Sequence, residues 1–208
     1  MRGLILKDLY NLRKYGKTLL LISALYIMLT FMMDDSSMFG GMIVLLFAIT
    51  SVTSFAYDSQ SGWDTYVLSI PVSRKEVVLS KYVLSALLAL MGGVLSLLMG
   101  WLHGVFNHVS NFSEMLLISY SLFAVALVLL SILLPLVYKF GVERSRVIIL
   151  AVIAIPSAAI MVLVQTGPMP ELSEQTFHQV LLLSPVVIIV CGIVSFVISH
   201  GIYRRKEV

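Results

Sequence analysis

Six long apolar runs, none of which contains an Asp, Glu, Lys or Arg, divide the chain. The runs cover roughly residues 18–33, 39–56, 82–101, 115–138, 147–165 and 180–202. A helix needs about 20 mostly apolar residues to cross a bilayer, where it satisfies its own backbone hydrogen bonds. Charged residues make up 12% of the chain, about half the share usual in a soluble domain. We therefore predict an all-α integral membrane protein with about six transmembrane helices.

The basic residues indicate the orientation of these helices. All 14 lysines and arginines fall in four segments, residues 2–17, 74–81, 139–146 and 204–206. The alternate connections hold acidic residues but no lysine or arginine. Because cytoplasmic loops gather Lys and Arg, we predict a multi-pass protein of the cell membrane with both termini in the cytoplasm.

The N-terminal residues form an amphipathic pattern. Apolar residues recur at helical spacing over residues 1–16, with charged side chains between them. We predict an amphipathic interfacial helix there, followed by a six-span permease domain over residues 17–208. A signal peptide is the alternative, and the lack of a small-residue cleavage site argues against it.

Residues for catalysis are missing from the apolar runs. The apolar runs contain no Asp, Glu, Lys or Arg that could form a proton relay. The sequence also shows no metal-ligand spacing and no nucleophile motif. Gly16-Lys17-Thr18 resembles the end of a phosphate-binding loop, but the motif requires glycine where Asn11 stands. We therefore expect no enzyme activity, no catalytic residue, no metal, no cofactor and no nucleic-acid partner.

Small and polar residues mark two of the predicted spans. Gly92, Ser96 and Gly100 lie four residues apart, a spacing that lets two helices approach closely. This face fits either a contact within the chain or a dimer contact. Four hydroxyl residues make the cytoplasmic end of the second span polar, which fits either a water-filled vestibule or hydrogen bonds between helices. These residues are Thr50, Ser51, Thr53 and Ser54.

The connection between the second and third spans, residues 57–81, is the longest polar stretch. Pro71 favours a turn, and Ser73 with Glu76 has the spacing of a capping box. We therefore predict a helix that starts near Arg74 and continues into the third span. A solvated connector is the alternative, but a loop this long in a compact chain favours a functional role.

Two segments carry a resemblance to a known family. Leu6-Lys7-Asp8-Leu9 is similar to the opening of type-2 ABC transporter permeases. The stretch YDSQSGWDTYVLSIPVSRKEVVLSKYV resembles the loop between their second and third spans, with the pattern LPVSRKEIVLSKY. Ile70 replaces the usual leucine and Val77 the usual isoleucine.

The resemblance implies two permease subunits, as a homodimer or related heterodimer, working with two copies of a cytosolic ATPase that binds ATP and Mg. It implies a bacterial exporter of hydrophobic or amphipathic cargo, with peptides favoured. It also implies that residues 71–76 lie at the ATPase-coupling helix. We predict that Arg74→Glu uncouples transport from ATP hydrolysis by the partner without unfolding the permease. The coupling residues would be Pro71, Val72, Ser73, Arg74, Lys75 and Glu76.

Other functions remain alternatives. A stand-alone secondary transporter or flippase would move its substrate in liposomes without a partner. A membrane-embedded hydrolase would need a nucleophile or a metal site. An immunity or sensor membrane protein would resemble a permease without stimulating an ATPase.

Overall fold

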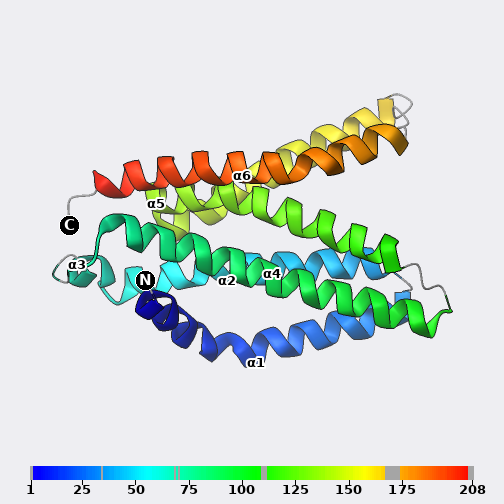
Figure 1. Cartoon of the computed structure of the whole chain (residues 1–208), viewed down its shortest axis with the longest axis horizontal. Coiled ribbons are helices and arrows are strands. Elements are labelled where there is room, and N and C mark those ends of the chain that lie inside the picture. The colour runs from blue at the N-terminus through cyan, green and yellow to red at the C-terminus, as the bar shows by residue number, and fades with distance from the viewer. Residues whose placement is uncertain are drawn as a thin grey trace.

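The structure is a computed structural model that describes the backbone of residues 2–33, 35–67, 69, 71–108, 112–166 and 174–205. The described part is helical and contains no strand, in agreement with the predicted all-α class. The long helices run roughly side by side, and the start of α1 and the end of α6 lie at the end of the bundle that carries α3, called the α3 end below (Figure 1). The helices are α1 (Arg2–Met33), α2 (Ser36–Gln60), α3 (Trp63–Val67), α4 (Arg74–Phe106), α5 (Phe112–Thr166) and α6 (Glu174–Arg204).

The predicted interfacial helix and first span form one continuous helix, α1, that bends along its length (Figure 1). Gly16 does not end the helix, because an internal glycine costs only about 1 kcal/mol relative to alanine. The boundary predicted at residues 16 and 17 therefore has no break in the described backbone.

The predicted fourth and fifth spans follow one another in α5, with the break at Gly141. This residue has φ 77° and ψ 174°, which lie outside the helical region. Glycine adopts a positive φ readily because it has no Cβ. The chain reverses direction after this point (Figure 1), so a single glycine replaces the loop predicted at residues 139–146. The backbone of the fifth predicted span, residues 147–165, is helical, but most of its side chains lie outside the described residues.

Five helices within the described residues are long and apolar enough to cross a membrane. The multi-span character is thus confirmed, while the number six and the cytoplasmic placement of the termini stay predictions. The five segments are Arg2–Met33, Ser36–Gln60, Arg74–Phe106, Phe112–Ser145 and Leu181–Arg204.

The connection predicted as a polar loop at residues 57–81 is largely helical. α2 continues to Gln60 and ends where Gly62 takes a positive φ of 63°. The short α3 follows, and α4 begins at Arg74. Helix propagation and glycine geometry, rather than polarity alone, decide the boundaries here.

The small residues of α4 pack mainly against α2. A Cβ at Gly92 would lie only 2.9 Å from the Cα of Val44, and a Cβ at Gly40 would lie 2.5 Å from the Ser96 Oγ. Gly100 lies near the first turn of α5. In the structure this face therefore serves contacts within the chain.

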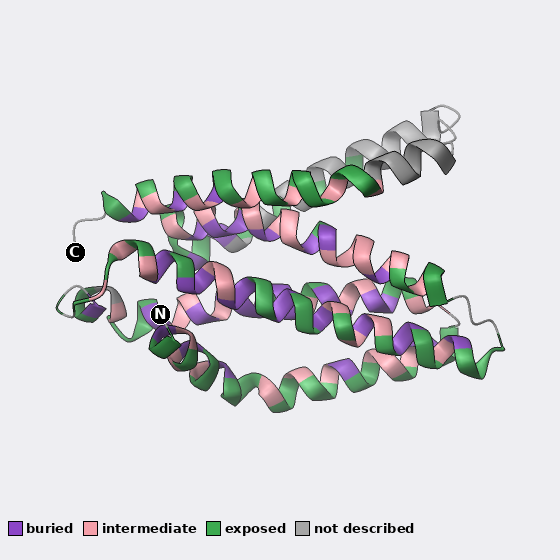
Figure 2. Cartoon of the chain, in the orientation of Figure 1, coloured by how far each residue is buried: buried purple, intermediate pink, exposed green. Residues whose placement is uncertain are grey.

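The helices differ in how far they are buried within the bundle. α2 is largely enclosed, with 56% of its most apolar window buried, against 11% for α1 and 6% for α6 (Figure 2). The exposed faces of α1 and α6 carry leucine, isoleucine, valine and methionine, which suits contact with lipid.

Candidate functional site

The start of α4 is fixed by a capping box at the α3 end. The Glu76 backbone N–H donates to the Ser73 hydroxyl at 3.2 Å, and the Glu76 carboxylate accepts from the Ser73 backbone N–H at 3.2 Å. This confirms the helix start predicted near Arg74. Pro71, Ser73 and Lys75 are exposed, whereas Val72, Arg74 and Glu76 are half-buried.

Val72 packs partly within the chain rather than standing free. It lies against an apolar cluster at the α3 end that joins α1, α3, α4 and α6. The buried members of that cluster are Leu4, Val67, Val77, Val78 and Tyr203.

Arg74 contacts the C-terminal end of α6. Its Nη1 donates to the backbone carbonyl of Tyr203 at 3.3 Å and to that of Arg204 at 2.5 Å. The last carbonyls of a helix lack partners within the helix and carry partial negative charge. Arg74 therefore caps α6, a contact that sequence reasoning did not foresee, while its predicted contact with an ATPase stays a prediction.

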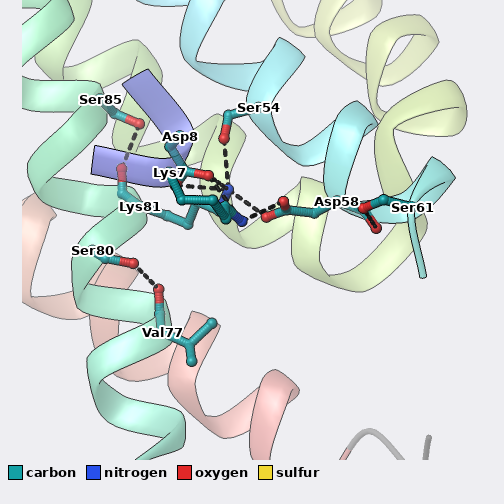
Figure 3. A network of polar contacts seen from close by, with 9 residues as sticks. All are labelled: Lys7, Asp8, Ser54, Asp58, Ser61, Val77, Ser80, Lys81 and Ser85. Atoms are coloured by element: carbon teal, nitrogen blue, oxygen red, sulfur yellow. Dashed lines mark hydrogen bonds and ion pairs between the residues drawn. The ribbon is translucent and has the colours of Figure 1, made fainter. Parts of the chain in front are cut away.

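Seven residues later, Lys81 occupies a buried ionic site. Its Nζ lies 3.0 Å from the Asp8 Oδ2, 2.5 Å from the Asp58 Oδ2 and 2.6 Å from the Ser54 Oγ (Figure 3). The three N–H donors of the ammonium thus have acceptors on α1 and α2. Lys81 is only 3% exposed and Asp8 only 1%.

Lys7 completes a cluster with equal numbers of positive and negative charges. Its Nζ lies 2.6 Å from the Asp58 Oδ1, 3.1 Å from the Asp8 Oδ1 and 3.8 Å from the centre of the Trp63 ring. Lys7, Asp8, Asp58 and Lys81 are called the lysine–aspartate cluster below. It joins three helices, α1, α2 and α4, beside the start of α4.

The burial of the lysine–aspartate cluster makes its pairing important for stability. Taking a charge out of water costs several kcal/mol per ion, and close partners repay this cost. Removing one partner of a buried pair typically costs about 3–5 kcal/mol, because the other charge is left buried and unpaired. The cluster therefore holds α4 in a defined position against α1 and α2.

A cavity of about 310 Å³ lies beside the lysine–aspartate cluster. Asp58 and Lys81 line one part of it, and the α5 break at Gly141 and Tyr203 of α6 line others. It is therefore bordered by the elements that meet at the α3 end. Within the described residues no group of three or more His, Cys, Asp or Glu side chains is placed to hold a metal.

Sequence reasoning missed this cluster, although one signal for it was present. Leu4, Asp8 and Leu12 lie four residues apart and are the buried residues of the first part of α1. An acidic residue in the middle of an apolar helical face indicates a buried partner of opposite charge. Of the hydroxyl residues at the end of α2, Ser54 bonds to another helix, whereas Thr50 and Ser51 bond to carbonyls of α2 itself.

The chain was compared with known protein families, curated proteins and solved structures. The family described as ABC-2 family transporter protein matches residues 3–204, which is nearly the whole sequence. The chain belongs to this family. No curated protein and no solved structure gave a match.

Membership confirms the resemblance to type-2 ABC permeases. The protein is a multi-pass membrane protein and a permease subunit of an ABC transporter. ABC-2 permeases normally work with an ABC ATPase partner. The 71–76 segment and the lysine–aspartate cluster are therefore features of an ABC-2 permease subunit.

Proposed function

We propose that this ABC-2 permease exports a hydrophobic or amphipathic substrate, with peptides as the favoured class, from a bacterial cell. A separate cytosolic ATPase binds ATP and Mg and supplies the energy, and the permease itself has no enzyme activity and no cofactor. Two permease subunits, identical or related, and two ATPase subunits make the complex. Both termini lie in the cytoplasm.

The observation that carries this proposal is the capped start of α4. Pro71, Ser73 and Lys75 are exposed and lie at the α3 end of the bundle, where α1 begins and α6 ends. The capping box and the Arg74 contact with α6 hold the segment in one position. A rigid, exposed segment of this kind suits docking on a soluble partner, because little conformational entropy is lost on binding.

The apolar character of the bundle supports the substrate class. A cavity of about 490 Å³ between α4, α5 and α6 is lined mostly by leucine, isoleucine, valine and aromatic side chains. Its described lining contains no acidic or basic residue. A hydrophobic or amphipathic molecule fits such a surface better than a charged polar solute.

Cysteine labelling tests the orientation on which the proposal depends. The chain has one cysteine, Cys191, so Cys191→Ser gives a cysteine-free background for Lys75→Cys. We expect a membrane-impermeant maleimide to label Lys75→Cys in inside-out vesicles but not in intact cells. Labelling from outside the cell alone would refute ATPase docking at this segment.

Purification in mild detergent tests the partner. We expect an ATP-binding protein of soluble composition to co-elute with the permease and to hydrolyse ATP faster in its presence. Ion-driven transport by liposomes that contain this chain alone would instead support a secondary transporter or flippase. A permease that binds no ATPase and transports nothing would support an immunity or sensor role.

A further inference from the structure

The lysine–aspartate cluster lies close to the 71–76 segment on the same helix. Arg74 and Lys81 are seven residues apart, which places them on one side of α4 and about 10 Å apart along its axis. Only about two helical turns separate the proposed docking segment from the ionic contacts of Lys81. A displacement of the start of α4 therefore moves Lys81 by nearly the same distance.

The contacts of Lys81 lead to two other helices. Its ammonium group binds Asp8 on α1 and both Asp58 and Ser54 on α2 (Figure 3). Asp8 lies in the N-terminal part of α1, which continues without interruption to Met33 at the opposite end of the bundle (Figure 1). A pull on Lys81 thus acts on a helix that extends along the bundle.

Ionic hydrogen bonds transmit such a displacement better than apolar packing does. Packed apolar helices slide past one another by small shear motions. A buried ammonium with three directed acceptors loses its bonds if either helix slides. The lysine–aspartate cluster therefore resists relative motion of α1, α2 and α4 at this point.

We propose that Lys81 is a positioning residue that makes α1 move together with the start of α4 when the ATPase binds ATP. This inference rests on the proposed function, because it requires an ATPase docked at the 71–76 segment. The lysine–aspartate cluster is the connection, and it converts a push at the α3 end into a movement of α1.

Two matched double variants separate transmission from folding. Lys81→Met with Asp8→Asn removes one positive and one negative charge and frees α4 from the cluster, while Lys7 and Asp58 remain paired. The control, Lys7→Met with Asp58→Asn, removes the same charges but leaves Lys81 bound to Asp8. Neither variant leaves a buried charge without an opposite partner.

The readout is the labelling rate of Met33→Cys in the Cys191→Ser background. Met33 is the last residue of α1 and is exposed. The permease–ATPase complex in lipid vesicles is labelled with fluorescein maleimide, with and without ATP and Mg. We expect ATP to change the labelling rate in the otherwise unsubstituted complex and in the Lys7 control, and to leave it unchanged in the Lys81 variant.

The outcomes distinguish this inference from the proposed function. Equal ATP effects in the Lys81 variant and the Lys7 control, with the ATPase bound, would overturn the role of Lys81 and keep the proposed function. An absent ATP effect in the unsubstituted complex with the ATPase bound would also overturn the inference. Failure of any ATPase to bind the unsubstituted permease would overturn the proposed function and the inference with it.

Rescue provides a further check. Lys81→Arg keeps the positive charge and its donors, so we expect it to retain the ATP effect on Met33→Cys. If the Lys81→Met, Asp8→Asn variant does not assemble, Lys81→Gln with Asp8→Asn takes its place, because it also removes one charge of each sign, and we expect the same loss of the ATP effect. Retention of the full ATP effect by this second double variant would overturn the proposal.

Discussion

The contact between Arg74 and the end of α6 allows a quantitative prediction. Arg74→Met keeps most of the aliphatic side chain but removes the hydrogen bonds to the Tyr203 and Arg204 carbonyls. Hydrogen bonds to a charged donor contribute about 1.5–3 kcal/mol, and a cation at a helix C-terminus adds about 0.3–1 kcal/mol. Because Arg74 is half-buried, we expect a loss near the lower limit, about 2 kcal/mol.

This loss is local, since the contact lies at the terminus of α6. A change of about 2 kcal/mol in local opening corresponds to about 30-fold faster amide exchange. Hydrogen-exchange mass spectrometry of the purified permease should therefore show faster exchange in the last turns of α6. The other helices should keep their rates. Arg74→Glu should exchange faster still, because a carboxylate would face the helix carbonyls.

The neighbouring lysine provides the control. Lys75→Met also removes one positive charge from the first turn of α4, but Lys75 is exposed. We expect the last turns of α6 to exchange at the unsubstituted rate in this variant. Equal exchange in Arg74→Met and Lys75→Met would refute the capping role of Arg74.

Three smaller predictions follow from other contacts. Gly92→Ala should lower the unfolding free energy by about 1–3 kcal/mol, because its Cβ would lie 2.9 Å from a backbone atom of α2. The control Gly93→Ala should be tolerated, because the nearest atom to its Cβ would be 3.5 Å away. Equal loss of stability in thermal melts of the two variants in detergent would contradict this. Ser73→Ala should cost about 1 kcal/mol by removing the α4 cap, measured as faster exchange in the first turn of α4, and an unchanged rate would argue against the cap. The Met38 N–H and then the Ser37 hydroxyl hold the pKa of Asp35 below its usual value, so its contribution to folding is present above pH 3.8 and is lost as the pH falls through the lowered pKa. Asp35→Asn should remove this pH dependence at the start of α2, and exchange rates there that depend equally on pH in both proteins would contradict the assignment.

Local patterns in the sequence were sufficient to predict several features of the protein. The uncharged runs predict a multi-span helical membrane protein, since each run by itself must avoid water. The start of α4 was also predictable, because the Ser73–Glu76 capping box involves residues only three apart. The pattern around this box led to the ABC-2 family, which the full-length family match confirmed.

The amino-acid sequence by itself therefore determined the membrane class, the family and the start of α4, since these depend on neighbouring residues. Only the tertiary structure decided what Asp8, Lys81 and Arg74 do. The Lys81–Asp8 contact joins residues 73 apart along the chain and the Arg74–Arg204 contact joins residues 130 apart, and no local pattern specifies which distant helix a charge will meet. A charged side chain near a helix end is ordinarily solvated; packing of α1, α2, α4 and α6 removes that water and makes these residues contacts between helices.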